Sequence, residues 1–147
     1  KIKIINSNLI DELSKNKKTY SKPFFSICNK ITGENYKNKI NKIQKFMLKN
    51  KSDYIFITAP ENIAWILNIR GHDNPNSPIP NCHLILDKQK TIYIIVERKK
   101  VKYLIKERKI KKNNIIEPKN FRILLSLLKG KKYKLMKKLV LHIMKIS

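Results

Sequence analysis

The feature that most restricts the fold of this chain is a change in apolar periodicity along its middle. Between residues 36 and 50 the apolar side chains recur at helical spacing, and lysines fill the opposite side. The next apolar run, DYIFIT at 53–58, is short, aromatic and β-branched, which is typical of a strand. A second helix is expected over 59–69, with Pro60 in its first turn and Gly71 just past its end. Rapid alternation of helix and strand predicts an α/β domain.

The second half of the chain continues this alternation. Two strands are expected at 82–87 and 91–97, joined by a short Lys-Gln-Lys hairpin turn. Between the second helix and the hairpin, the loop 70–81 contains three prolines and is expected to be rigid and extended. Two further helices follow, and their expected buried positions are Val101, Leu104 and Ile105 in the first, and Phe121, Leu124, Leu125 and Leu128 in the second. Together these elements predict a mixed β-sheet flanked by helices.

Composition limits the classes of partner. The formal net charge is +24, which by itself suggests nucleic acid or an anionic membrane surface. Only four of the 34 basic residues are arginine, however, and arginine is the residue that reads bases and binds phosphates bidentately. The excess of Lys, Ile and Asn is also what AT-rich codons supply. No specific nucleic-acid site is therefore predicted, although weak adhesion to polyanions at low salt is expected.

Cysteine usage and hydropathy favour a cytoplasmic protein without a transmembrane segment. No apolar run approaches the roughly 18 residues that span a bilayer. Cys28 and Cys82 stand alone without C-x-x-C spacing, which argues against a zinc site and a disulfide framework. Free thiols are the norm in a reducing cytosol.

The sequence contains no complete set of catalytic residues at the spacing of a known catalytic motif. Ten acidic residues and three histidines are thinly spread, and no metal-ligand, phosphate-loop or nucleophile-elbow motif occurs. Cys82 and His83 are neighbours on an expected strand, so their side chains point to opposite faces. Arg70 is the most notable polar residue, with two open interpretations: it complements a helix dipole, or it presents a fixed cation to a carboxylate.

Residues 61–71, ENIAWILNIRG, resemble the D/E-E-I-A-W-L-L-N-L-R-G signature of Xaa-Pro aminopeptidases (aminopeptidase P), metallopeptidases of the creatinase/prolidase type. Arg70-Gly71, Asp73, Pro75 and Pro78 follow the family's R-G-S-D-x-P-x-N-P in register, although His72 stands in place of its serine. Residues 8–132 are similar to the second creatinase-like amino-terminal domain of the three-domain form. The resemblance implies a ribonuclease-H-like mixed sheet flanked by helices.

The same resemblance implies the organisation of the chain. Residues 1–35 correspond to an interdomain connector, 36–132 to the creatinase-like domain, and 133–147 to a divergent or truncated tail. Apolar residues recur at helical spacing in this tail, which predicts an amphipathic helix that packs on the protein or lies on a membrane surface. The family's catalytic domain, with its two Asp, one His and two Glu that bind two divalent metal ions, commonly manganese, has no counterpart in this sequence. The chain is therefore expected to be a truncated remnant.

The resemblance finally implies a supporting function. Domains of this kind help to wall the substrate entrance and contribute to subunit contacts, so Arg70, His72 and Asp73 are the expected substrate-entrance residues. Trp65 and Leu67 are expected in the core, and Asp73 is expected to fix its loop through backbone hydrogen bonds. No catalytic residue, metal ligand or cofactor is expected in this chain, which alone should be inactive. Proline-containing peptides are expected as ligands only beside a catalytic domain.

Two alternative functions remain open from the sequence. The chain is either a basic module that binds nucleic acid or anionic membranes, or a partner that docks onto a separately encoded catalytic domain. A homo-oligomer is also compatible with the expected subunit contacts.

Overall fold

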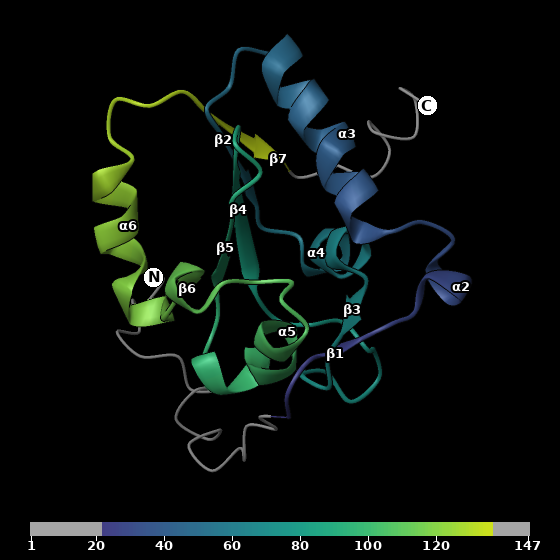
Figure 1. Cartoon of the computed structure of the whole chain (residues 1–147). Coiled ribbons are helices and arrows are strands. Elements are labelled where there is room, and N and C mark those ends of the chain that lie inside the picture. Colours follow the sequence, from purple (N-terminus) through teal and green to yellow (C-terminus); the bar gives the residue numbers. More distant parts are fainter. Residues whose placement is uncertain (1–21, 137–147) are drawn as a thin grey trace, which may run out of the picture.

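The computed structural model of the protein describes residues 22–136. Its centre is a five-stranded mixed sheet with the order β6-β5-β4-β2-β7 (Figure 1). The strands are β2 (Tyr54–Ile57), β4 (His83–Asp87), β5 (Ile92–Ile95), β6 (Ile115–Ile116) and β7 (Tyr133–Met136). β2, β4 and β5 pair antiparallel, whereas β7 runs parallel to β2, and β6 runs parallel to β5. The predicted mixed sheet and the hairpin are confirmed.

Helices cover the two faces of this sheet unequally (Figure 1). The longer α-helices are α3 (Tyr36–Lys49), α4 (Pro60–Leu67), α5 (Lys102–Lys106) and α6 (Phe121–Leu127), with the short α2 (Asn29–Thr32) before them. Three 3₁₀ turns are η1 (Arg98–Val101), η2 (Lys112–Asn114) and η3 (Pro118–Asn120). In Figure 1, α3 and α4 lie on one side of the sheet, and α6 lies alone on the other.

The face under α3 and α4 carries the main hydrophobic core. Alternate residues of the strands point to it, because side chains of a strand alternate between faces. The fully or almost fully buried members are Ile55, Ile57, Leu84, Leu86, Ile92 and Ile94 from the sheet, and Ile40, Ile43, Phe46 and Met47 from α3. The apolar stripe predicted for residues 36–50 is therefore the buried side of α3.

The α6 face of the sheet is less completely covered. Pro118 opens the expected helical segment, but none of its residues in α6 is buried. Leu125 is 46% exposed, whereas Leu124 and Leu128 are only half-buried. The side of α6 that was predicted to be buried does face the sheet, because Phe121 packs on Phe56 with ring centroids 5.4 Å apart. The prediction that its residues are buried is wrong, because α6 has no buried residue.

The end of α4 differs from the sequence prediction. The helix stops at Leu67, and Asn68, with φ 51° in the left-handed region, is its C-cap. Gly71 is therefore not the helix stop. A Cβ at Gly71 would lie 2.8 Å from Cα of Pro80 and 3.1 Å from the Phe24 ring, so glycine is required there for close packing.

Part of the segment interpreted as connector packs on the domain. Phe24 is fully buried in the core, and its N–H donates to the Lys100 carbonyl over 2.7 Å. β1 (Phe25–Ser26) pairs antiparallel with β3 (Ile69–Arg70), the two residues that follow the α4 cap. Residues 24–26 therefore belong to the folded unit.

The tail begins as a strand. The amphipathic helix predicted for the tail, residues 133–147, is wrong for Tyr133–Met136, which form β7 at the edge of the sheet. Parallel pairing with β2 overrides the helical apolar pattern, since it satisfies the backbone groups of that strand. The remaining apolar positions of the predicted tail helix lie outside the described residues.

Candidate functional site

Three cations surround the carboxyl end of α4. The last carbonyls of a helix lack partners within it, and cations there also offset the negative end of the helix dipole. Each cation donates a hydrogen bond to a different carbonyl, in the pairs Lys39 Nζ to Trp65 O (2.8 Å), Lys109 Nζ to Leu67 O (3.2 Å) and Arg70 Nη1 to Ala64 O (3.4 Å). The sequence predicted only the arginine at this position.

Lys39 and Asn68 form the inner part of this arrangement. Lys39 is 1% exposed, and its Nζ donates to Asn68 Oδ1 over 2.6 Å and lies 4.4 Å from the Trp65 ring centre. Asn68 Nδ2 in turn donates to the carbonyl of Glu34 over 2.7 Å. Burial lowers the pKa of Lys39, as does the nearby charge of Arg70, whereas Glu34 opposes this shift. Sequence analysis missed Lys39 because only tertiary packing brings α3 to the end of α4.

Arg70 lies in β3 with its guanidinium turned back toward α4. Besides the Ala64 carbonyl, Nη1 donates to the carbonyl of Ile69 over 2.8 Å. Its position corresponds to the first of the two interpretations, the one in which it complements the helix end. The hydrogen bonds of the described residues do not join Arg70 to Asp73.

Asp73 fixes the proline-rich loop, as the sequence predicted. Its Oδ2 accepts from the N–H of Asn81 over 2.7 Å, and its Oδ1 accepts from Lys100 Nζ over 2.7 Å. The two charged side chains are only 7% and 14% exposed. This pair ties the loop to η1. Cys82 is buried beside it, and burial raises the pKa of that thiol, with the charge of Asp73 adding to the shift.

The loop itself is compact, whereas an extended course was predicted. The N–H of Gly71 donates to the Pro78 carbonyl over 2.9 Å, and an isolated bridge joins Asn74 to Ser77. The chain thus folds back on itself, since prolines restrict φ without preventing reversals. His72 projects from this loop as an exposed residue and stacks on Phe25, with ring centroids 5.2 Å apart.

The three predicted substrate-entrance residues therefore do not converge. Arg70 contacts the end of α4, Asp73 contacts Lys100 and the Asn81 N–H, and His72 lies outside against Phe25. Of the three, His72 is the exposed one.

The donor groups in residues 22–136 do not fit a two-metal centre. No group of three or more His, Cys, Asp or Glu in this part of the chain is arranged to hold a metal ion. His83, for example, has Nδ1 3.3 Å from the Thr58 carbonyl and its ring against Phe56. No described helix is long and apolar enough to cross a membrane.

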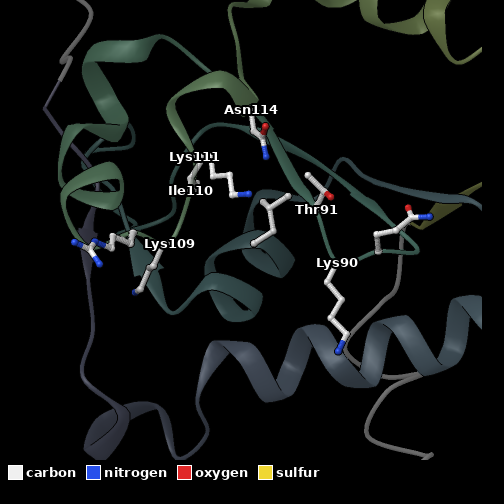
Figure 2. Close-up of a pocket in the computed structure, with 9 residues that line it drawn as sticks. Lys90, Thr91, Lys109, Ile110, Lys111 and Asn114 are labelled. Atoms are coloured by element: carbon white, nitrogen blue, oxygen red, sulfur yellow. The ribbon is translucent and has the colours of Figure 1, made fainter.

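A small basic hollow lies at the end of the β4–β5 hairpin (Figure 2). It has a volume of about 220 Å³, and its polar lining includes Lys90, Thr91, Lys111 and Asn114. Figure 2 shows these side chains coming from the hairpin turn and from the segment before β6. The two segments are distant in sequence, so residue spacing gave no signal for this hollow.

Comparison with known proteins identifies the family. Residues 15–145 match the creatinase/prolidase N-terminal domain. The chain belongs to this family. It is 30% identical over 71 residues to Xaa-Pro aminopeptidase 1 of Dictyostelium discoideum, which is 48% of this chain and 11% of the relative. It is 27% identical over 96 residues to a probable Xaa-Pro aminopeptidase P of Neurospora crassa, or 63% of this chain and 14% of the relative.

A solved structure agrees on the fold. The X-prolyl aminopeptidase from Caenorhabditis elegans, described as a cytosolic enzyme with a di-nuclear active site, superposes with a TM-score of 0.69 at 20% identity. The match covers 84% of this chain and 20% of that protein. The creatinase-like fold expected from residues 61–71 is thus confirmed. This chain corresponds to a small part of the length of each of these proteins.

Proposed function

We propose that this creatinase N-terminal domain works in the cytoplasm as a non-catalytic part of a Xaa-Pro aminopeptidase, beside a catalytic domain that holds the metal ions. Such an enzyme removes the N-terminal residue that precedes proline. Family membership supports this role, together with the similarity to enzymes of that name.

The proline-rich loop is proposed to form part of the wall of the substrate entrance. The observation that carries this role is the combination of a fixed loop with an exposed aromatic pair, His72 on Phe25. Asp73 and Arg70 act indirectly, because Asp73 holds the loop on η1 and Arg70 holds the end of α4. Peptide residues beyond the proline would then meet His72 rather than the two buried or half-buried charges.

A chimaera tests this role. Residues 15–145 of this chain would replace the matching domain of the Dictyostelium discoideum enzyme, and the hydrolysis of Xaa-Pro dipeptides and longer Xaa-Pro peptides would be measured. In this chimaera His72→Ala should raise KM about 2–5-fold for longer peptides, as expected for the loss of one aromatic contact. The kcat values and dipeptide kinetics should not change.

The control substitution is Lys45→Ala, an exposed position on α3, which should leave all kinetic constants unchanged. Equal effects of His72→Ala on dipeptides and longer peptides would contradict a position at the entrance. The purified chain alone, freed of host peptidase, should neither hydrolyse Xaa-Pro peptides nor bind Mn²⁺ tightly. Metal-dependent turnover by the chain alone would overturn the non-catalytic role.

The same proposal includes contacts with other chains. A catalytic-domain partner and a second copy are the two expected neighbours, and co-purification with the catalytic domain tests the first. A second candidate function, the binding of polyanions, is favoured by the net charge of +24 and by the basic hollow of Figure 2. Titrations of DNA and heparin at several salt concentrations test this function, because polyanion binding depends on counterion release.

A further inference from the structure

The α6 face of the sheet contains an apolar groove. It has a volume of about 660 Å³, within the range of about 300–1,000 Å³ typical of ligand pockets. Its floor is formed by the outer side of the sheet and its walls by α6 and β7, with the apolar lining residues Tyr54, Phe56, Ile85, Leu125, Leu128 and Leu135. Leu125 and Leu135 are 46% and 51% exposed, so water reaches much of this apolar surface.

The helix beside the groove is apolar over most of its surface, and its two polar residues, Arg122 and Ser126, lie four positions apart on one side. Its sequence, FRILLSL, contains one charge, and Ile123 and Leu127 on its outer side are 61% and 73% exposed. The apolar part of such a helix normally packs against other protein. β7 is also an edge strand of the described sheet, with Tyr133 71% exposed. The groove and the outer side of α6 together form a contiguous exposed apolar surface, which marks an interaction site.

The positive charge around the groove favours an acidic partner. Residues 118–136 contain six Lys and Arg and no Asp or Glu. Three carboxylates at neighbouring strand ends are engaged: Asp53 pairs with Lys88, Asp87 accepts the N–H groups of the hairpin turn, and Glu117 accepts from the Arg98 N–H. At this basic border a second copy would be repelled, because each copy carries a net charge of +24, so a contact between copies is expected at another surface.

We propose that the groove between α6 and β7 binds an amphipathic acidic helix of a partner protein, with its apolar side on Phe56 and Leu135 and its carboxylates toward Lys129 and Arg122. The helix-in-groove mode provides the apolar anchors, and the basic border provides specificity and faster association. The proposal does not rest on the substrate-entrance role, because none of the residues that line the groove belongs to the loop 70–81 or to β1.

The test uses the full chain and two labelled 18-residue peptides. Both carry leucines along one helical side, and the other side carries glutamates in one peptide and lysines in the other. Fluorescence anisotropy at about 150 mM salt, where long-range charge attraction is largely screened, measures their binding. The acidic peptide should bind at least about tenfold more tightly, a difference of about 1.4 kcal/mol.

Matched variants locate the binding site. Leu135→Glu and Leu125→Glu should each weaken binding of the acidic peptide about tenfold or more, as expected for central anchors. Leu48→Glu makes the same charge change at a leucine of α3 that is 58% exposed, and it should weaken binding less than about twofold. Leu135→Asn, which adds no charge, should also weaken binding and so separates the loss of apolar contact from repulsion.

Several outcomes would overturn the proposal. These are no binding of the acidic peptide, equal binding of both peptides, or an equal loss with Leu48→Glu. A dimer of the full chain that Leu135→Glu dissociates would assign the groove to a second copy instead. Thermal melts of each variant verify folding, and hydrolysis by the chimaera, which reports the proposed peptidase role, should be unaffected by Leu135→Glu.

Discussion

At the scale of residues, the motif around the end of α4 stabilises the point where the helix ends and the chain changes direction. Asn68 adopts the left-handed conformation that ends the helix, and its side chain is bonded to Lys39 and to the Glu34 carbonyl. Asparagine tolerates this conformation better than most residues. Arg70 then donates to the Ala64 carbonyl of α4 and to the carbonyl of Ile69 in β3. The polar side chains of Lys39, Asn68 and Arg70 therefore form hydrogen bonds that hold the fold together.

Substitution of Arg70 should therefore change stability even without a catalytic partner. Arg70→Ala is expected to lower the free energy of unfolding by about 1–3 kcal/mol, because two partly buried carbonyls lose a charged donor. Urea denaturation monitored by the Trp65 fluorescence measures this loss. Arg98→Ala, at an exposed arginine of η1, is the matched control and should change stability by less than about 0.5 kcal/mol. Equal losses in both variants would contradict the structural role of Arg70.

The pair of Asp73 and Lys100 should be strongly coupled. Because both side chains are nearly buried, Asp73→Ala is expected to cost about 3 kcal/mol by leaving the ammonium without its partner. The double variant Asp73→Ala/Lys100→Met should be much less destabilised than the sum of the single variants. A double-mutant cycle from denaturant unfolding measures the coupling, and simple additivity would show that the ion pair is unimportant.

At the scale of elements, one carboxylate joins three strand ends. Asp53 precedes β2, its Oδ1 accepts from Lys88 Nζ after β4, and its Oδ2 accepts from the N–H of Lys132 before β7. Its own carbonyl accepts from the Lys88 N–H over 3.0 Å. The edge strand β7 is thus anchored at its start by contacts that its own sequence does not contain.

This anchor should respond to acid. The hydrogen bond from Lys88 and then that from Lys132 hold the pKa of Asp53 below its ordinary value of 3.8. A carboxylate with a depressed folded pKa stabilises the protein above the unfolded value, and this contribution is lost as pH falls through the folded pKa. Asp53→Asn should therefore be less stable than the parent at pH 7, and the difference should shrink below pH 3.8. Chemical denaturation across pH 2–7 measures it, and a difference independent of pH would contradict this role.

At the scale of the whole molecule, positive charge is distributed over the surface. The sequence has 34 basic and 10 acidic residues, so most lysines have no carboxylate to pair with. Lys39 and Lys109 differ from the surface lysines, because they donate to carbonyls at the end of α4, and burial lowers the pKa of both. The surface charge therefore affects association and solubility rather than the fold.

Adhesion to polyanions should be weak and indifferent to sequence. Binding of single-stranded DNA should fall linearly on a logarithmic scale with salt and be negligible near about 150 mM, because it depends on counterion release. Titrations of unrelated DNA sequences and of heparin at several salt concentrations measure this. A strong preference for one sequence at physiological salt would favour a dedicated nucleic-acid function over the peptidase-associated role.

Local patterns determined which segments form most elements. The stripe from Tyr36 onward became the buried side of α3, and the β-branched runs became β2, β4 and β5. Pro60 started α4 as predicted, and the ENIAWILNIRG signature indicated the family. These features succeed because the sequence itself contains the periodicity, the turn residues and the signature that specify them.

Tertiary structure alone decided where the polar groups point and how the edge of the sheet forms. Arg70 turned toward α4 and Asp73 toward Lys100, since those partners come from other elements. Tyr133–Met136 formed a strand despite a helical apolar pattern, because β2 offered an unpaired edge. The sequence pattern of one segment depends only on its own side chains and can predict its secondary structure. Hydrogen bonds between segments depend on how the whole chain packs, so such a pattern cannot predict them.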